Sequence, residues 1–547
     1  MTRAVALCVA TLAVVAVTWW WLGRPVEVPP VAADPGRIQC VSYAPFRGND
    51  SPLDEATRVS AGDIEEDLAK LARLTDCVRT YSTENGLDQV PAIAKRVGLK
   101  VIQGLWLGSD RKKNRARIDA TVALAKQYRD TITAIVVGNE VLLRGELAAP
   151  DIAEVLREVK TATGIPVTYA DVWEYWLRNR ELAEAVDFIT IHILPYWEDF
   201  PISAEQAGAH VDAIRGRVAA SFPGKDILIG EVGWPSAGRM REGALPSPAN
   251  QARVLEEVMA RARANHYRVN LIEAFDQPWK RKLEGTVGGY WGLLSSGGRV
   301  PKFAWGQPVS NHPLWVWQGA AGVALAAIVF AAAFAPWRQD WLEAFRREAW
   351  RDKRFDLPAP LLAGLAIDAL AAGIEAPWAV ANAVTESLGA GGWVRGLALI
   401  AVSVGAPVAV AMTLARGVAV PPFPRVLGRA AQRPGSGLAV AAGAILVAVT
   451  LLALQTALGL VFDPRYRDFT FAPLTASVVP FAVASVVGVR GRAPLGRAER
   501  VAAVTLLGSA VYIVLNESFA NWQAVWFAAM LAVLAVTLFR LRDVQSS

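Results

Sequence analysis

The chain has 547 residues, 53% of them hydrophobic, and its mean hydropathy is positive. That composition excludes a single soluble globule, because the apolar excess lies in long uncharged runs that are typical of membrane spans. The net charge of +6 comes mostly from arginines beside those runs. No zinc spacing, Walker loop or basic aromatic stripe occurs, so nucleic-acid and nucleotide binding are not indicated.

The N-terminal segment, residues 4–22, is apolar and long enough to cross a bilayer, with Arg3 before it and tryptophans at its far end. A cleaved signal peptide is the alternative, since residues 31–33 are small. That site lies far from the apolar run, and the run is long for a signal peptide. We therefore expect an uncleaved anchor over residues 1–23 with a cytoplasmic N-terminus, followed by a proline-rich spacer over residues 24–36.

From residue 37 to residue 312, short apolar runs alternate with amphipathic helical patterns. Eight strands are predicted, at residues 38–44, 77–81, 101–105, 134–139, 167–170, 188–191, 227–230 and 270–275. Helical patterns separate most of them, for example at residues 63–74, 114–128, 152–161, 204–219 and 248–265. Eight such alternations predict an α/β fold of the (β/α)8 or TIM barrel type, with its active site at the C-terminal ends of the strands. A doubly wound sheet is the alternative, but no glycine-rich fingerprint follows the first strand.

Two of these strands, the fourth and the seventh, end abruptly in a glutamate. The aliphatic runs that reach Glu140 and Glu231 are typical of strands buried on both faces, so each carboxylate is expected where its strand leaves the core. Two glutamates facing one cleft are what retaining glycoside hydrolysis needs, one as acid/base and one as nucleophile. One such glutamate could simply cap the following helix or pair with an arginine. These non-catalytic roles explain less well why two glutamates occur in the same position at the end of a strand.

Aromatic and polar side chains follow the predicted strands on the same side as the two glutamates. Indoles stack on the flat faces of sugar rings, so a cluster of them predicts a carbohydrate groove, although core packing is the alternative for each one. The tryptophans are Trp106, Trp173, Trp176, Trp197, Trp234 and Trp279. Further candidate substrate contacts are Tyr43, Arg79, Asn139, Tyr169, Tyr196, Asp276 and Lys280.

Residues 138–140 (Gly-Asn-Glu) and 230–236 (Gly-Glu-Val-Gly-Trp-Pro-Ser) resemble the signature segments of glycoside hydrolase family 17, the β-1,3-glucanases and β-1,3-glucanosyltransferases. Residues 78–81, 195–196 and 273–280 resemble further landmarks, and the last segment is closer to the fungal and bacterial branch than to plant enzymes. The resemblance covers the whole barrel segment, and the bacterial membrane-bound members of the family look like partners of β-glucan synthesis that make branched or cyclic products.

The resemblance implies a retaining mechanism without a cofactor or metal, in which Glu231 is the nucleophile and Glu140 the acid/base. It further implies that Asn139 donates a hydrogen bond to the sugar 2-hydroxyl. The chain departs from many members at His192, where they have Asn, and from plant members at Gln277, so plant-style subsites are not transferred. We expect the charge of Glu231 to raise the pKa of Glu140.

The three cysteines are Cys8 in the anchor, Cys40 in the first predicted strand and Cys77 at the start of the second. Neighbouring strands can bring the latter two together, and an extracytoplasmic compartment permits a bridge. Because strand register cannot be obtained from the sequence, we expect two buried free thiols and keep the bridge as the alternative. The four histidines are scattered and predict no metal site.

The segment 313–547 is predicted to be a membrane domain with seven spans. They lie at residues 314–335, 360–380, 393–414, 438–460, 474–489, 501–515 and 524–539. Arginine-rich loops follow every second span, at residues 338–354, 416–433 and 490–500, and Arg540 and Arg542 close the chain. The positive-inside rule then places both termini in the cytoplasm and the barrel outside it, in the periplasm of a bacterial inner-membrane protein.

Two carboxylates, Asp368 and Glu375, fall inside one predicted span, seven residues apart and so on one helical face. Carboxylates inside a membrane are candidates for a glucan or proton path. Pairing inside the bundle, or a wet position near an interface, is an equal alternative. The loop at residues 462–469 mixes aromatic and charged residues, which suits polysaccharide guidance and an interfacial anchor equally well.

These features favour a retaining β-glucan transglycosylase that elongates, branches or cyclises a nascent β-1,3-glucan, with the lipid bilayer and a membrane glucan synthase as partners. A hydrolase of the same mechanism is one alternative. A non-catalytic protein for glucan binding or export is another, although both glutamates are present. A synthase within the membrane part is disfavoured, because its loops are too short for a nucleotide-sugar domain.

Overall fold

The computed structural model describes residues 2–28, 37–334, 358–428, 436–489 and 496–541. These residues form two compact units, Val26–Val309 and Met1–Pro25 with Ser310–Ser547. The predicted spacer and the predicted arginine-rich loops lie wholly or partly outside the described residues, as does Arg542. The fold of each unit can be compared with its prediction.

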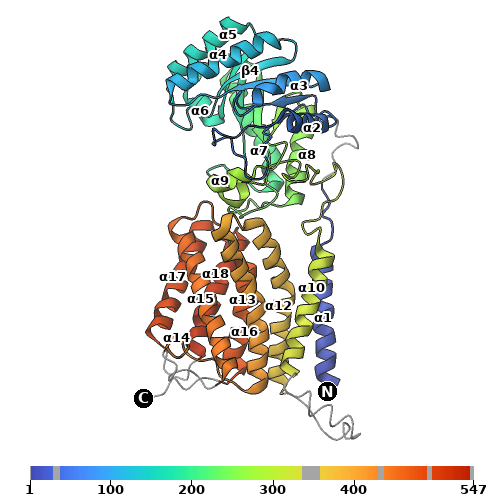
Figure 1. The fold of residues 1–547 in the computed structure, drawn as a ribbon, viewed down its shortest axis with the longest axis vertical. Coiled ribbons are helices and arrows are strands. Elements are labelled where there is room, and N and C mark those ends of the chain that lie inside the picture. The colour runs from blue at the N-terminus through green and yellow to red at the C-terminus, as the bar shows by residue number, and fades with distance from the viewer. Residues whose placement is uncertain (1, 29–36, 335–357, 429–435, 490–495, 542–547) are drawn as a thin grey trace. The chain divides into compact units, whose positions relative to one another are not determined.

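The first unit is a closed barrel of eight parallel strands in the order β1 to β8 (Figure 1). The strands are β1 (Cys40–Ser42), β2 (Cys77–Arg79), β3 (Lys100–Leu105), β4 (Ile132–Asn139), β5 (Val167–Val172), β6 (Ile189–His192), β7 (Ile227–Val232) and β8 (Arg268–Leu271). Because β1 also pairs with β8, the barrel has no free edge. The predicted TIM barrel is confirmed. Each strand overlaps its predicted range, although β8 shares only Asn270 and Leu271 with the predicted residues 270–275.

Helices connect consecutive strands and surround the barrel. They are α2 (Ala61–Leu71), α3 (Val90–Val97), α4 (Arg111–Gln127), α5 (Ala149–Thr163), α6 (Trp173–Arg178), α7 (Ala204–Ser221), α8 (Pro248–Ala264) and α9 (Arg281–Gly288). The hydroxyls of Ser60 and Ser247 accept hydrogen bonds from backbone N–H groups in the first turns of α2 and α8, which fixes where these helices begin. Gly98 and Gly164 end α3 and α5 in the left-handed conformation that favours glycine.

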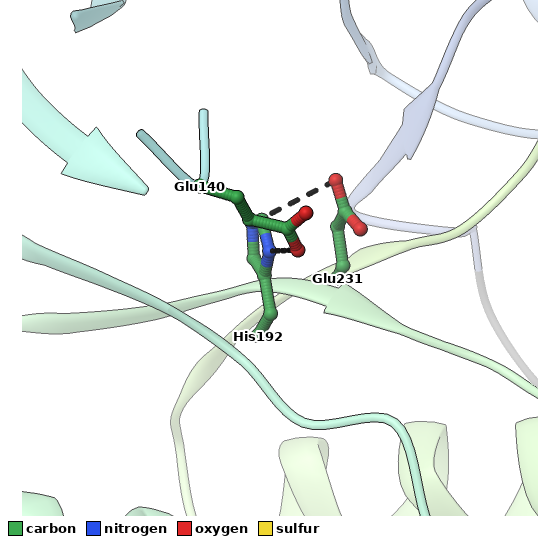
Figure 2. A group of neighbouring side chains, drawn as sticks. All are labelled: Glu140, His192 and Glu231. Atoms are coloured by element: carbon green, nitrogen blue, oxygen red, sulfur yellow. Dashed lines mark hydrogen bonds and ion pairs between the residues drawn. The ribbon is translucent and has the colours of Figure 1, made fainter. Parts of the chain in front are cut away.

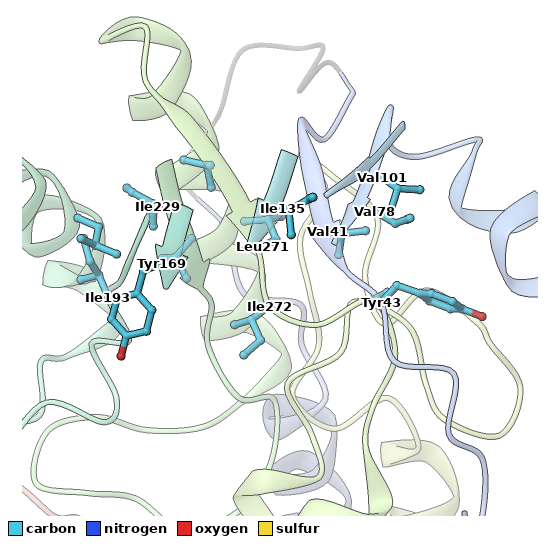
Figure 3. Close-up of a cluster of buried hydrophobic side chains, with 14 of the residues drawn as sticks. Val41, Tyr43, Val78, Val101, Ile135, Tyr169, Ile193, Ile229, Leu271 and Ile272 are labelled. Atoms are coloured by element: carbon cyan, nitrogen blue, oxygen red, sulfur yellow. The ribbon is translucent and has the colours of Figure 1, made fainter. Parts of the chain in front are cut away.

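Alternate residues of the strands build two apolar layers, because successive side chains of a strand point to opposite faces. The larger layer lies between strands and helices and includes Val41, Val78, Val101, Ile135, Ile229 and Leu271 (Figure 3). The smaller layer takes the intervening positions and consists of Cys40, Ile102, Ala134, Val136, Ala170, Phe188 and Leu228, with Cys77 packed against it. The two layers can form only if strands carry apolar residues on both faces, and the sequence predicts this for β4 and β7.

Cys40 and Cys77 form a disulfide between β1 and β2. The register pairs Val41 with Val78, so the two cysteines that precede them lie opposite each other, with Cα atoms 4.4 Å apart. The prediction of two free thiols is therefore wrong, and the bridge, kept as its alternative, is correct. Cys8 is the free cysteine.

The second unit is made of apolar helices. They are α1 (Thr2–Leu22), α10 (Trp315–Phe334), α12 (Ala359–Glu386), α13 (Gly389–Arg416), α14 (Phe423–Leu427), α15 (Gly437–Phe462), α16 (Phe471–Val487), α17 (Arg497–Glu517) and α18 (Trp522–Arg540). Within the described residues, seven of these helices are long and apolar enough to cross a membrane: α1, α10, α12, α13, α15, α17 and α18. The fifth predicted span of the C-terminal segment corresponds to the shorter apolar helix α16.

Close contacts between small residues bring α1, α10 and α12 together, and α1 runs beside α10 (Figure 1). A Cβ atom on Gly322 would lie 2.0 Å from the carbonyl oxygen of Gly373, so only glycine allows this approach of α10 to α12. The indole N–H of Trp19 donates to the same carbonyl at 3.0 Å. The N-terminal helix is thus an integral part of the helical unit.

The two carboxylates predicted inside one span, Asp368 and Glu375, lie on the buried side of α12. Neither oxygen of Asp368 has a hydrogen-bond partner among the described residues. Pairing within the bundle, the alternative explanation for Asp368, is therefore not seen in the described part of the chain.

The disulfide gives a prediction for stability. Cys77→Ala should lower the free energy of unfolding of the barrel by about 3–4 kcal/mol, because the bridge closes a loop with a sequence separation of 37 residues. Thermal unfolding of the purified oxidised protein measures the effect, and Cys8→Ala is the matched control that should leave Tm unchanged. A Cys77→Ala variant with the parent's Tm would contradict the bridge.

Candidate active site

The two predicted catalytic glutamates meet at the C-terminal end of the barrel. Glu140 directly follows β4, and Glu231 lies near the end of β7, with His192 of β6 beside both (Figure 2). One oxygen of each carboxylate and a ring nitrogen of His192 all lie within 4.8 Å of one another. Retaining glycosidases separate their carboxyl groups by about 5–5.5 Å and inverting enzymes by about 6.5–9.5 Å. The spacing therefore fits a double displacement.

A turn at the end of β4 orients Glu140. Gly138 and Glu140 both have positive φ, of 85° and 54°. A Cβ atom on Gly138 would lie 2.8 Å from Cγ2 of Val141. Glycine is therefore required at this position both by the positive φ and by the lack of space for a side chain. The backbone N–H of Glu140 then donates to the carbonyl oxygen of Ala170 on β5 at 2.7 Å, which fixes the turn.

Two donors from the end of β2 hold Glu231. Nη1 of the fully buried Arg79 donates to Oε1 of Glu231 at 3.2 Å and to the carbonyl oxygen of Gly230 at 2.7 Å. The hydroxyl of Tyr81 donates to the same carboxylate oxygen at 2.9 Å. Burial, and then the charge of Glu231, raise the pKa of the Tyr81 phenol, so it stays a donor. These contacts fix the orientation of the Glu231 carboxylate, which is compatible with the nucleophile role predicted for it.

Arg79 also connects Glu231 to Asn139, the residue before Glu140. Its second guanidinium nitrogen donates to Oδ1 of Asn139, which fixes that amide with its oxygen toward the arginine. The amide nitrogen of Asn139 is thereby the group left for a ligand. This orientation is compatible with the donor role that the sequence resemblance implies for Asn139.

The electrostatics of Glu140 differ from the expectation. Burial raises the pKa of Glu140, but the hydrogen bond and charge of His192, together with the charges of Lys280 and Arg144, lower it further than burial raises it. The net pKa lies below the ordinary glutamate value, so the expected increase is wrong. The reason is that cations surround Glu140, and the expectation considered only the charge of Glu231.

Lys280, predicted as a site residue, lies at the end of the short helix Pro278–Lys280 and forms an ion pair with Glu273. Burial raises the pKa of Glu273 to about 7, and the lysine opposes this shift. The charge of Lys280 also acts on Glu140 and Tyr81, which places this side chain close to the reacting groups.

Four predicted tryptophans keep part of their surface exposed: Trp106, Trp173, Trp197 and Trp279. The guanidinium of Arg144 lies 4.2 Å from the ring centroid of Trp106, and Trp197 stacks on Trp291 with an interplanar angle of 16°. Rings held in this way offer rigid apolar surface to a sugar at little entropic cost.

Six other predicted contacts lie in the protein core, where they offer no surface to a sugar ring: Tyr43, Tyr169, Trp176, Tyr196, Trp234 and Asp276. Trp176 and Trp234 are 1% and 0% exposed, and their indole N–H groups donate to the carbonyl oxygens of Thr190 and Leu245. The tyrosine hydroxyls and the carboxylate of Asp276 likewise have partners inside the barrel. Core packing, the alternative given for each tryptophan, describes Trp176 and Trp234.

Two residues of the site, Tyr81 and His192, were not among the predicted site residues. Each stands at the C-terminal end of a predicted strand, which is the signal that identified the two glutamates. A search for every polar residue at a strand end would have included both. The sequence pattern does not give side-chain direction. The structure shows that Tyr81 turns toward the carboxylate of Glu231 and His192 toward that of Glu140.

Glu140, His192 and Glu231 are also the group of described residues whose ligand atoms are spaced as in a metal site. The direct contact between His192 and Glu140, at 2.8 Å, and the guanidinium beside Glu231 both oppose a cation at that position. The arrangement is better suited to proton and glycosyl transfer.

Comparison with known proteins supports this assignment. The sequence model of the BtgE/BtgC glycoside hydrolase domain matches residues 40–292. A glucan 1,3-beta-glucosidase of Saccharomyces cerevisiae is 27% identical over 265 residues, which cover 44% of this chain and 85% of that protein. A probable family 17 glucosidase of the same organism is 27% identical over 265 residues, covering 47% of this chain and 64% of the relative.

A crystal structure of a family 17 beta-1,3-glucanosyltransferase from Rhizomucor miehei is also similar, at 24% identity and a TM-score of 0.43. The match covers 49% of this chain and 98% of that one. Residues 40–292 thus resemble the BtgE/BtgC glycoside hydrolase domain and share distant sequence similarity with the fungal glucosidases.

The site predicts distinct outcomes for its two carboxylates. Glu231→Gln should abolish turnover, because an amide cannot form the glycosyl ester. Glu140→Gln should retain more activity on aryl β-glycosides than on oligosaccharides, because a good leaving group needs little protonation. Azide should restore turnover to Glu140→Ala and give a glycosyl azide of retained configuration.

Steady-state kinetics on both substrate types measure these effects. Glu154→Gln, at an exposed position of α5, is the matched control and should behave like the parent. More than trace activity in Glu231→Gln would overturn the assignment of the nucleophile.

Proposed function

We propose that this protein is a membrane-anchored retaining transglycosylase that acts on β-1,3-glucan and elongates, branches or cyclises a nascent chain. The observation that carries the proposal is the pair Glu140 and Glu231, whose oxygens lie within 4.8 Å in a domain of glycoside hydrolase type. The substrate class follows from the relatives, which include glucan 1,3-beta-glucosidases.

The proposed reaction has two steps. Glu231 attacks the anomeric carbon while Glu140 protonates the departing glycosidic oxygen, which leaves as a sugar hydroxyl. In the second step Glu140 takes the proton of the acceptor hydroxyl, whose oxygen displaces the ester of Glu231. The donors Arg79 and Tyr81 hold the nucleophile in the first step and stabilise it as a leaving carboxylate in the second.

A sugar acceptor is favoured over water by the surroundings of the site. The partly exposed rings of Trp106, Trp173, Trp197 and Trp279 offer stacking surfaces for an acceptor chain. An acceptor held in attack geometry gains an effective concentration of ~10⁵ M or more, which exceeds the ~55 M of water. A helical unit with seven helices of spanning length among the described residues keeps the enzyme where a membrane synthase would release its glucan.

An extracytoplasmic barrel in the bacterial inner membrane is part of the proposal. Disulfides persist outside the cytoplasm, and the Cys40–Cys77 bridge supports that compartment. The arginine distribution of the sequence supports the same orientation, with both termini in the cytoplasm. A membrane glucan synthase is the proposed partner, because a glycosyl transferase of this type needs preformed glucan.

The acceptor can be tested with the purified full-length protein in detergent and a β-1,3-linked oligosaccharide. The expected products are longer than the substrate and carry a new β-1,3 or β-1,6 linkage, as measured by mass spectrometry and linkage analysis. Chain shortening alone, at high substrate concentration, would make the protein a hydrolase of the same mechanism. Binding without any bond cleavage would leave the non-catalytic alternative.

Orientation can be tested with a reporter that is active only outside the cytoplasm. Fusions after Asn311 or Leu460 should be active, and fusions after Arg354 or Arg433 should be inactive. The opposite pattern would place the barrel in the cytoplasm and contradict the proposed compartment.

A further inference from the structure

His192 ends β6, and its ring lies completely buried between the two glutamates (Figure 2). Nδ1 lies 2.8 Å from Oε1 of Glu140, within hydrogen-bond distance, whereas Nε2 lies 3.7 Å from Oε1 of Glu231. Nε2 has no hydrogen-bond partner among the described residues. A buried ring nitrogen without a partner is costly, so packing alone does not explain this position.

The contact between His192 and Glu140 creates a problem for the reaction. A general acid must carry a proton when the glycosidic bond breaks. His192, Lys280 and Arg144 lower the pKa of Glu140 and so favour its ionised form, and His192 contacts the carboxylate directly. His192 is a titratable group whose Nδ1 lies within hydrogen-bond distance of the Glu140 carboxylate, so it is placed to supply the proton that reaches the glycosidic oxygen.

Other charged groups face this pair from several elements. Asp171 is a buried residue of β5, and its neighbour Val172 pairs with His192. The hydroxyl of Tyr169 donates a hydrogen bond to the Asp171 carboxylate, which directs it to the same end of the barrel. The remaining charged or titratable groups are Glu231 of β7, Arg79 and Tyr81 at the end of β2, Arg144 after β4 and Lys280 after β8. Groups of both charge signs therefore surround the pair Glu140 and His192.

We propose that His192 is a positioning residue that stores the proton of the acid/base and exchanges it with Glu140 during the retaining reaction proposed above. When a glycoside displaces water, Nδ1–H passes its proton to Oε1 of Glu140, and neutral His192 remains. Glu140 gives that proton to the leaving oxygen as Glu231 forms the ester bond and the glycosidic bond breaks. In the second step the acceptor proton returns to Glu140 and then to Nδ1, so the two steps balance.

His192→Asn tests the proposal, because asparagine keeps a hydrogen-bonding amide but cannot hold a proton. An imidazole retains its proton to higher pH than a carboxyl group does. The alkaline limb of kcat/KM for a β-1,3-linked oligosaccharide should therefore move to lower pH by about one unit or more in the variant. An aryl glycoside, which needs little protonation, should show a much smaller change.

The matched control is His266→Asn, at an exposed residue after α8 whose positive φ of 53° suits asparagine. This variant should have the parent's pH profile on both substrates. If His192 has only a packing role, His192→Asn should lower activity equally at every pH and leave the shape of the profile unchanged. That result would overturn the proposal.

A second measurement is independent of activity. Infrared difference spectra of the full-length protein between two pH values report the protonated carboxyl band of Glu140, which Glu140→Gln identifies by its loss. The band should appear at higher pH in His192→Asn than in the parent, because the cation that favours ionised Glu140 is gone. An unchanged band would contradict the proposal.

The two measurements also separate this inference from the proposed function. A parent protein that is inactive on β-1,3-glucan refutes the proposed substrate, while the infrared experiment still tests the proton exchange. An active parent with the same alkaline limb in His192→Asn refutes the role of His192 and leaves the proposed function intact.

Discussion

The active site depends on one buried cation. Arg79 is 0% exposed, and its guanidinium joins three strands. It lies on β2 and donates hydrogen bonds to Gly230 and Glu231 of β7 and to Asn139 at the end of β4. A charge that is buried without partners costs several kcal/mol, so the barrel end is stable only with these acceptors in place. The same contacts that make Arg79 acceptable in the core therefore orient Glu231 and Asn139, the residue before Glu140.

Around this cation, the two carboxylates have different surroundings. Glu231 accepts hydrogen bonds from Arg79 and Tyr81, both fixed donors, and this suits a group that must be ionised at the start. Glu140 instead contacts His192, whose Nδ1 lies 2.8 Å from its carboxylate oxygen. Two glutamates of the same chemistry are thus prepared for different roles by the neighbours that the barrel supplies.

The sequence predicts those parts of the fold that local patterns encode. The aliphatic runs ending at Glu140 and Glu231 identify two strands and two catalytic candidates, because strand burial and strand ends are visible along the chain. The bridge between Cys40 and Cys77 depends on the register between two strands, which no local pattern contains.

The direction in which a side chain points beyond a strand end is likewise not contained in any local sequence pattern. Trp176 turns inward to pack beside Phe222, whereas Trp106 stays at the surface under Arg144. Trp106 directly follows β3 and Trp176 comes four residues after β5, and the sequence alone does not tell which of the two is buried.

Trapping the covalent intermediate tests the central claim most directly: a 2-deoxy-2-fluoro-β-glucosyl fluoride should inactivate the protein and label the peptide that contains Glu231, as detected by mass spectrometry. A label on another residue, or turnover with inverted configuration and no label, would contradict the account.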